Sequence, residues 1–250
     1  PRAPRIYPPS KHPVRRDQIP RGARMVTEKL QEAGYRAFVV GGAVRDLLLG
    51  LTPKDFDIAT DATPEQVKPL FRRAYIIGRR FRLVHVHVGA EVLEVSTFRA
   101  AQKNDDATDE HGRLLSDNVY GSQAEDAARR DFAINALYFD PATEEIWDYV
   151  GGVIDCRARR LKLIGPPTTR YREDPVRMLR AVRLAAKANL TIDPKTAAPI
   201  PKLANLMQNV PPARLFDEMQ KLLLSGHATE ALQRFRRLYA AQGFQVLGYI

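Results

Sequence analysis

Cysteine and long apolar runs are scarce in this sequence. Cys156 is the single cysteine among 250 residues, which excludes an internal disulfide and favours a reducing, cytoplasmic compartment. No stretch approaches the about 18 consecutive apolar residues that a transmembrane helix needs, and residues 1–24 contain no apolar block long enough for a signal peptide. The chain begins with proline rather than methionine, so we expect it to be a trimmed piece of a longer protein.

Acidic residues are in the minority. There are 39 Lys and Arg against 29 Asp and Glu, a formal net charge of +10. Such a chain favours a polyanionic partner, most simply a nucleic acid, although charge alone does not separate RNA from DNA or from an anionic membrane. Neither zinc-ligand spacing nor a helix-turn-helix pattern is present, so a DNA-binding protein is the least favoured class.

The composition divides the chain into three parts. Residues 1–24 carry six prolines and seven Arg or Lys against one acid, and we interpret them as an extended basic arm that either contacts nucleic acid or is a disordered tail. Residues 25–152 mix strand and helix patterns, which predicts an α+β domain. Residues 153–250 predict a helical domain, and no internal repeat is found.

Hydrophobic periodicity and capping residues predict the individual elements. Helices are expected over residues 25–33, 43–49, 63–71, 122–138, 173–187, 201–208, 212–224 and 228–241. Strands are expected over 38–40, 55–58, 83–88, 91–98 and 145–150, and a loop over 100–118.

A glycine turn lies early in the first domain. Gly41 and Gly42 end a short apolar run and open a helix, an arrangement that lets backbone N–H groups approach a phosphate. Arg45, one turn into the helix, would add a charged fork. A lone Gly-Gly pair more often belongs to an ordinary loop.

Two aspartates follow this turn. Asp55 and Asp57 alternate with Phe56 and Ile58, and a strand directs residues two apart to one face. A lone Asp-x-Asp is usually a solvated turn, but beside a phosphate turn it predicts a metal clamp. His85 and His87 are also two apart, yet no further ligand has suitable spacing, so polar residues on a sheet are favoured over a structural zinc site.

Gly-Gly-x-Val-Arg-Asp at 41–46, followed by Asp-Phe-Asp at 55–57, resembles the nucleotidyltransferase signature of the tRNA nucleotidyltransferase/poly(A) polymerase family. The resemblance implies that Asp55 and Asp57 hold two catalytic Mg²⁺ ions, for which Mn²⁺ could substitute, and that ATP is the nucleotide substrate. It also implies a polymerase-β-like head with a mixed or antiparallel sheet, followed by an all-helical neck and the start of a body that guides an RNA 3′ end.

The resemblance calls for a third carboxylate from a neighbouring strand. Glu94 lies in the middle of the predicted strand 91–98, where a carboxylate is otherwise costly to bury, whereas Glu91 lies near the turn. We therefore expect Glu94 to be the third catalytic carboxylate.

Two further motifs in the head resemble nucleotide-binding segments of this family. Thr97-Phe98-Arg99 resembles the edge of the nucleotide pocket, so Arg99 would meet phosphate. Arg129-Arg130-Asp131-Phe132 with Asn135 implies that Arg130 touches the triphosphate and that Asp131 meets the ribose or a metal-bound group as a catalytic residue. The alternative is an exposed, salt-bridged helix face.

A third motif lies in the helical part. Glu173-Asp174-x-x-Arg177 resembles the motif with which the family reads the base, and an aspartate acceptor with an arginine fork suits a nucleobase edge. Arg180 lies one turn further on. The bland alternative is an ordinary charged surface helix.

The product depends on the segment after the metal strand. Ile76 to Val86 resembles the segment that separates bacterial poly(A) polymerases from CCA-adding relatives, and Arg79, Arg80 and Arg82 are expected to hold an RNA backbone. The resemblance thus implies template-independent polyadenylation of an RNA 3′ end, single-stranded or from messenger or small RNA. The alternatives are a CCA-adding enzyme and a catalytically silent RNA-binding protein.

Overall fold

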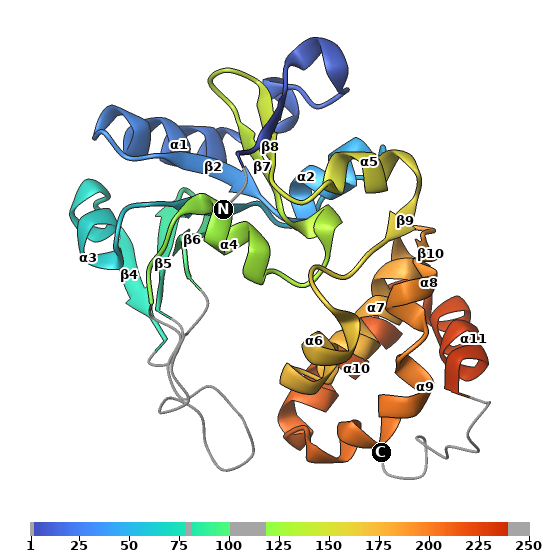
Figure 1. Cartoon of the computed structure of the whole chain (residues 1–250). Coiled ribbons are helices and arrows are strands. Elements are labelled where there is room, and N and C mark those ends of the chain that lie inside the picture. The colour runs from blue at the N-terminus through green and yellow to red at the C-terminus, as the bar shows by residue number, and fades with distance from the viewer. Residues whose placement is uncertain (1–2, 79–81, 101–118, 240–250) are drawn as a thin grey trace. The chain divides into compact units, whose positions relative to one another are not determined.

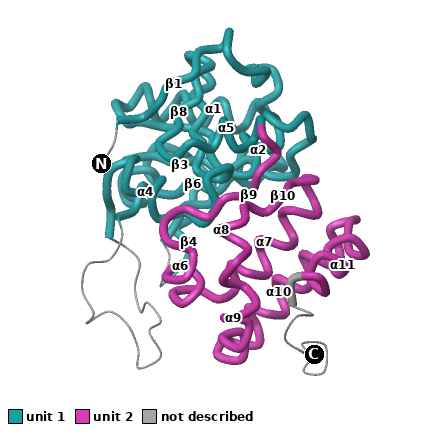
Figure 2. Tube along the Cα trace, turned by 45° about the vertical axis from the view of Figure 1, so that its right-hand side comes forward, with its two compact units in different colours: residues 1–157 teal, residues 158–250 magenta. Residues whose placement is uncertain are grey.

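The computed structural model describes residues 3–78, 82–100 and 119–239. The chain forms two compact units, Pro1–Arg157 and Ala158–Ile250, coloured separately in Figure 2. The predicted boundary after residue 152 falls at the start of helix α5 (Gly152–Arg157), which belongs to the first unit.

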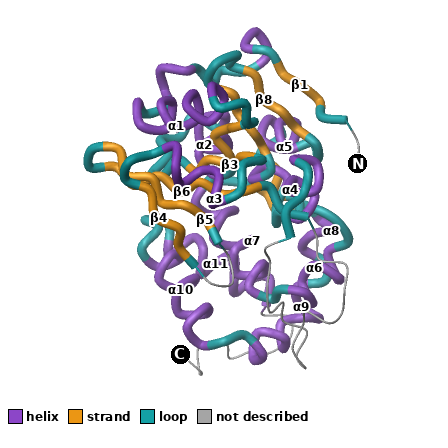
Figure 3. The backbone as a smooth tube through the Cα atoms, turned by 90° about the vertical axis from the view of Figure 1, so that its left-hand side faces the viewer, coloured by secondary structure: helices purple, strands orange, loops and turns teal. Residues whose placement is uncertain are grey.

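An eight-stranded mixed sheet runs through the first unit (Figures 1 and 3). Its order is β1-β8-β7-β2-β3-β6-β5-β4. β3 and β6 are parallel, and the other neighbours are antiparallel. The predicted α+β class is confirmed. The strands are β1 (Arg5–Tyr7), β2 (Ala37–Val40), β3 (Asp57–Thr60), β4 (Ala74–Ile77), β5 (Leu83–Val88), β6 (Glu91–Thr97), β7 (Leu137–Asp140) and β8 (Glu145–Asp148).

One face of the sheet is covered by α1 (Arg21–Glu32) and α3 (Pro64–Val67). α1 packs on β2, β3 and β6, and α3 packs on β4 and β5. Ala23, Val26 and Leu30 of α1 are fully buried, which follows from their helical spacing. Leu93 and Val95 of β6 are buried on this side, and the alternation of a strand therefore sends Glu94 to the opposite face.

The opposite face is closed over part of the sheet. Phe38 lies 6.1 Å from Tyr138 and 5.5 Å from Trp147, ring centre to ring centre. α4 (Gln123–Arg129) joins this side through Asp126, which accepts a hydrogen bond from the Tyr138 hydroxyl. Towards β4 the same face is open, and Tyr75 has 53% of its surface exposed.

The N-terminal residues are not the extended arm that their composition predicts. β1 pairs antiparallel with β8, and short 3₁₀ turns follow at Pro9–Lys11 and Arg16–Gln18. Val14 and Ile19 are buried, and Arg16 pairs with Glu28 of α1. Segment 3–24 thus belongs to the first unit, and α1 begins four positions earlier than the predicted helix at Met25.

The predicted helix 122–138 is wrong in its second half. α4 ends at Arg129, and Arg130 has an extended backbone with φ −61° and ψ 167°. Asp131 Oδ1 accepts hydrogen bonds from Phe132 N and Asn135 Nδ2, a local pattern that competes with the helix. A 3₁₀ turn, η5 (Ala133–Asn135), and then strand β7 replace the remaining turns.

In its described residues, 158–239, the second unit contains helices and one pair of short parallel strands, so the prediction of an all-helical domain needs correction. The predicted helix 173–187 is divided at Asp174, which is extended (φ −150°, ψ 94°) because Pro175 follows it. Met178, Val182 and Ala185 form the expected buried stripe. The elements are α6 (Pro167–Glu173), α7 (Val176–Lys187), α8 (Pro194–Ala197), α9 (Ile200–Leu203), α10 (Pro212–Leu223), α11 (Ala228–Tyr239), β9 (Arg160–Leu161) and β10 (Thr191–Ile192).

Within the described ranges, none of the helices has the length and apolar content to cross a membrane.

Candidate active site

A row of paired residues crosses the sheet and brings the candidate carboxylates together. Tyr138 of β7 pairs with Val40 of β2, which pairs with Asp57 of β3. β3 and β6 run parallel with Ile58 opposite Val95, so one step back along both strands sets Asp57 beside Glu94. Residues in register share a face of a sheet. The half of the row at β7 is buried, whereas Asp57 and Glu94 are exposed.

The Asp57 carboxylate is crowded by like charge. It is reached by solvent but surrounded by protein on most sides, and its pKa is raised from 3.8 to about 6. Desolvation is the largest cause, and the negative charge of Glu94 is the next. Arg130 lowers the pKa, and Asp55 raises it further. Asp57 is therefore a carboxylate without enough positive charge around it.

These carboxylates suit a hard cation by their chemistry. Among the residues that the structure describes, no three His, Cys, Asp or Glu side chains already converge as a metal cluster. Oxygen ligands are nevertheless what Mg²⁺ prefers, and the repulsion at Asp57 is the kind that a bound cation relieves. The predicted strand 55–58 needs correction, because β3 begins at Asp57 and Asp55 lies in the exposed segment before it. By their chemistry Asp55, Asp57 and Glu94 fit a divalent cation, and the metal assignment stays a prediction.

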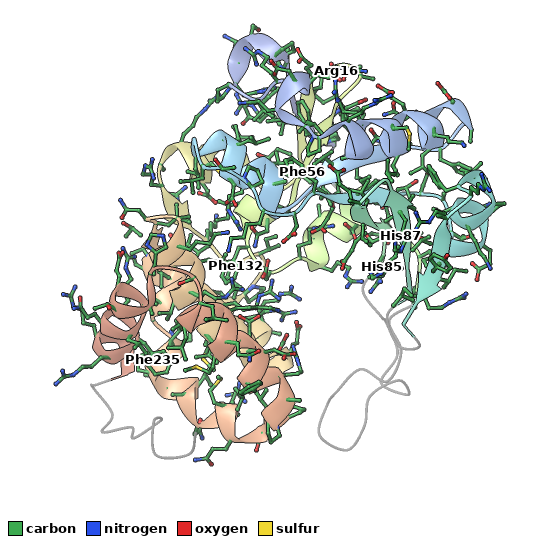
Figure 4. The ribbon with its side chains drawn as sticks, turned by 180° about the vertical axis from the view of Figure 1, so that it is seen from behind. Arg16, Phe56, His85, His87, Phe132 and Phe235 are labelled. Carbon is green, nitrogen blue, oxygen red and sulfur yellow. The ribbon has the colours of Figure 1, made fainter. Side chains whose placement is uncertain are left out.

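The neighbouring histidines contribute differently. His85 and His87 lie on the same side of β5 (Figure 4). His85 Nε2 is 3.6 Å from Glu94 Oε1, and the His87 ring packs edge-on against Tyr75 at 5.4 Å. His85 on β5 is thus the next residue in the row of paired residues after Glu94, on the side of the sheet face that is open.

The glycine turn lies directly beside this row. Gly41 follows Val40 and has φ 79° and ψ −128°, a conformation that a side chain disfavours. A Cβ atom on Gly41 would lie 3.6 Å from Nη1 of Arg130. The turn therefore combines a backbone conformation that favours glycine with a nearby arginine side chain. Helix α2 (Gly42–Leu48) begins at the next residue.

Arg45 is buried rather than directed outwards. Only 4% of its surface is exposed, its Nε donates to Asp46 Oδ1 at 2.8 Å, and its Nη1 donates to Asn135 Oδ1 at 2.6 Å. The structure therefore gives Arg45 a role in holding the turn against η5. Its predicted contact with phosphate stays a prediction.

Arg130 is held on several sides. Its Nε and Nη2 both donate to Asp126 Oδ2 at 3.0 Å, and Nη1 lies 3.4 Å from the Asn135 carbonyl oxygen. The guanidinium also stacks over the ring of Tyr138 at 5.4 Å. The structure thus brings Arg130 close to the glycine turn, and its charge acts on Asp57. Its predicted contact with the triphosphate stays a prediction.

Asn135 links the remaining groups. Its amide nitrogen donates to Asp131 Oδ1, while its side-chain oxygen accepts from Arg45. Asp131 therefore belongs to the same network as the glycine turn, although its role towards the ribose or a metal is untested. Sequence patterns do not single out Asp126, because its contacts reach forward to a strand that the local pattern does not predict.

The other predicted basic residues are partly accounted for. Arg99 is buried and donates from Nη2 to the carbonyl oxygen of Arg82, at 3.2 Å. Arg82 forms an ion pair with Glu65. Arg79 and Arg80 lie outside the described residues. Contact of these arginines with RNA or phosphate stays a prediction.

The predicted base-reading residues belong to the second unit. Asp174 Oδ2 accepts from Arg214 at 3.0 Å, and Arg177 Nη1 donates to the Arg170 carbonyl oxygen at 2.7 Å. Asp174 Oδ1 is buried without a hydrogen-bond partner in the described part of the chain. Arg180 is half-buried. The two motif residues are thus held by different neighbours, and their role in base recognition stays a prediction.

Comparison with known families gives two matches. The profile described as "Poly A polymerase head domain" matches residues 37–162, and the profile described as "Probable RNA and SrmB- binding site of polymerase A" matches residues 189–245. The first covers the glycine turn, the carboxylates and Arg130. The second covers α8 to α11, the described helices that follow α7.

Individual relatives agree with these matches. The chain is 52% identical to poly(A) polymerase I of Salmonella typhi over 95% of its own length and 52% of the relative's. It is 39% identical to the CCA-adding enzyme of Bacillus subtilis, over 84% and 52% respectively. The crystal structure of Bacillus stearothermophilus CCA-adding enzyme in complex with CTP superposes with a TM-score of 0.74 at 36% identity, covering 84% of this chain and 50% of that one. The chain thus spans about half the length of the curated relatives it matches.

Proposed function

This chain belongs to the tRNA nucleotidyltransferase/poly(A) polymerase family, and from that membership we propose that it adds adenylates to RNA 3′ ends without a template. ATP is the donor, and pyrophosphate is released. The observation that carries the proposal is that Asp57, the first residue of β3, lies beside Glu94 and near the glycine turn and Arg130. An exposed carboxylate crowded by like charge suits catalysis better than structural support.

In the proposed reaction the RNA 3′-oxygen bonds to the α-phosphorus of ATP, the bond between the α- and β-phosphates breaks, and the hydroxyl proton is released. Divalent cations held by Asp55, Asp57 and Glu94 would lower the pKa of the hydroxyl and neutralise the leaving pyrophosphate. Arg130 binds the triphosphate as a charged donor beside the Gly41 backbone.

The remaining groups orient the nucleotide. Asp131 accepts a hydrogen bond from the ribose, and its own carboxylate is oriented by Phe132 N and Asn135. In the second unit, the buried Oδ1 of Asp174 suits the amino group of adenine, and Arg177 supplies a donor. Arg79, Arg80 and Arg82 bind the RNA backbone, in line with the positive charge of the chain.

The runner-up function is CCA addition to tRNA. It is supported by the TM-score of 0.74 with a CCA-adding enzyme bound to CTP. Poly(A) synthesis is favoured because the identity to a poly(A) polymerase I is higher, at 52% against 39%. The two reactions use the same carboxylates, so the product decides between them.

The test is a product assay. With Mg²⁺, an arbitrary single-stranded RNA and ATP alone, we expect many adenylates to be added, whereas CTP alone is a poor substrate. In the opposing arm, tRNA without its CCA end is supplied with CTP and ATP. Addition of two cytidines and one adenosine followed by a stop, with arbitrary RNA left untouched, would establish the CCA-adding reaction instead. RNA binding without any nucleotide transfer would support the silent RNA-binding protein.

A further inference from the structure

A buried carboxylate outside the candidate metal site accepts hydrogen bonds from three different residues. Asp126 of α4 exposes 6% of its surface. Its Oδ2 accepts from the Tyr138 hydroxyl at 2.6 Å and from Nε and Nη2 of Arg130 at 3.0 Å. Its Oδ1 accepts from the backbone N–H of Arg99 at 3.2 Å. One side chain is therefore bonded to both head arginines that the family resemblance assigns to phosphate.

We propose that Asp126 and Tyr138 are positioning residues that hold Arg130 at the triphosphate site. The inference rests on the proposed function and names the groups that determine how tightly the triphosphate part of ATP is bound. Neither residue touches the reacting atoms. Both act through the guanidinium of Arg130.

The contacts fix the guanidinium on three sides. Asp126 bonds the Nε and Nη2 edge, the Tyr138 ring lies against one face at 5.4 Å, and the Asn135 carbonyl oxygen lies near Nη1 at 3.4 Å. Nη1 is also the atom that would lie 3.6 Å from a Cβ on Gly41. An arginine side chain that becomes ordered only when it binds a ligand loses conformational entropy at that step. Arg130 is already ordered in the folded protein, so its guanidinium is preorganised for phosphate.

The electrostatics support a permanently charged fork. Burial alone would lower the pKa of Arg130, but Tyr138 and Asp126 raise it above its ordinary value. Tyr138 itself is fully buried and has a raised pKa, chiefly through desolvation, so its hydroxyl stays a donor to Asp126. The hydroxyl therefore fixes the orientation of the carboxylate, and the carboxylate fixes the arginine.

The test removes a single oxygen atom. Tyr138→Phe retains the ring against Arg130 and deletes the hydrogen bond to Asp126. Tyr149→Phe is the matched control, because the Tyr149 hydroxyl donates to Gln123 Oε1 at 3.1 Å and its ring packs edge-on against Tyr138. Dissociation constants for ATP and for AMP are measured by calorimetry on the purified protein, together with KM and kcat for ATP.

We expect Tyr138→Phe to weaken ATP about fivefold while AMP binding changes by less than about twofold, since Arg130 meets the triphosphate and a hydrogen bond to a charged group is lost. Asp126→Asn should act in the same direction. The loss should appear in KM more than in kcat, and Tyr149→Phe should behave like the wild type.

A double-mutant cycle excludes a merely structural effect. If Tyr138 acts through Arg130, Tyr138→Phe adds no further loss of ATP affinity in an Arg130→Lys background. Equal weakening of ATP and AMP, or additive losses in the cycle, would overturn the positioning role. A wild-type protein that binds no ATP would instead overturn the proposed function, and the inference with it.

Discussion

Two groups of carboxylates in the first unit have opposite surroundings. Asp126 and Asp148 are buried and accept hydrogen bonds from several donors each. Asp57 is exposed, and the largest charge effect on it comes from another carboxylate, Glu94. The negative charges of Asp126 and Asp148 are compensated by donors within the protein, whereas those of Asp57 and Glu94 are not.

The difference separates structural from catalytic use of one side-chain type. The Asp148 carboxylate accepts hydrogen bonds of 2.8–3.1 Å from four backbone N–H groups, those of Val150, Gly151, Gly152 and Val153. These bonds hold the start of α5 in place. Asp57 destabilises the folded protein for as long as its charge is uncompensated. A cation that binds at Asp57 would therefore stabilise the ionised carboxylate by offsetting the repulsion from Glu94.

The largest expected effect concerns Asp57→Asn. Turnover should fall at least about a hundredfold, because an amide is a poor ligand for a divalent cation. Without metal, the same variant should be more stable by up to about 1 kcal/mol, a value limited by solvent screening at this exposed site. Adenylate transfer and thermal unfolding with EDTA measure the two effects.

Asp61→Asn is the matched control at the other end of β3. Asp61 is exposed and accepts from the backbone N–H of Arg36 at 2.8 Å, so its substitution should leave turnover unchanged. Turnover of Asp57→Asn within about tenfold of the wild type would remove Asp57 from the metal site. Glu94→Gln should also reduce turnover strongly, and loss with Glu91→Gln alone would move the third carboxylate to Glu91.

Asp148→Ala tests the structural role of a buried, hydrogen-bonded carboxylate. Four backbone N–H groups would lose their acceptor, and we expect the free energy of unfolding to fall by about 3 kcal/mol. Chemical denaturation measures the change. The comparison variant is Asp140→Ala on the neighbouring strand β7, where Oδ1 accepts from Gln31 and Ala142 N. A cost for Asp148→Ala no larger than that for Asp140→Ala would contradict the structural role.

The smallest expected effect concerns His12, which is buried near Arg15 and Glu144. Desolvation lowers its pKa below 6.5, although the Tyr7 and Glu144 backbones and the Glu144 charge oppose the shift and Arg15 adds to it. Below about pH 6.5, His12 binds a proton more readily in the unfolded chain than in the folded protein. The free energy of unfolding therefore decreases as the pH falls below that value. We expect the free energy of unfolding to decrease between about pH 6.5 and about pH 5.

The measurement for His12 compares unfolding at several pH values. His12→Phe retains an aromatic ring near Phe139, which the His12 ring meets edge-on at 6.3 Å, and removes the titrating group. The difference in stability between the two proteins should therefore change with pH below about 6.5. A difference that stays constant with pH would show that His12 does not contribute.

Sequence patterns predicted the parts that depend on short-range order. β5 and β6 agree with the alternation of buried and exposed residues, and the glycine turn followed from Gly41 and Gly42. The strand that carries Glu94 also follows from its own residues, but Glu94 is exposed rather than buried, and its role as the third carboxylate stays a prediction. In each of these cases the deciding information lay within a few neighbouring residues.

The errors arose where distant contacts decide. Arg130 to Tyr138 has helix-forming residues, yet the apolar run 137–139 pairs with β2 and β8, and Asp131 caps its own following turn. The N-terminal segment has the composition of a disordered tail, yet β8 provides an edge to which β1 binds. The burial of Arg45 against Asn135, ninety positions away, also lies outside any local pattern, and the predicted contact of Arg45 with phosphate is still to be tested.

The pairing of β1 with β8 has a practical consequence for shortening this protein. A version that begins at Met25 would delete β1 and expose the backbone edge of β8 along Ile146–Asp148. Uncovered strand edges pair with other copies of the same chain. Such a version would also lose Tyr7, whose ring lies within 5.5 Å of the Arg157 guanidinium at the end of the first unit. Self-association of the shortened protein would then obscure its assay, and the first two dozen residues are best kept in any version made for crystals or kinetics.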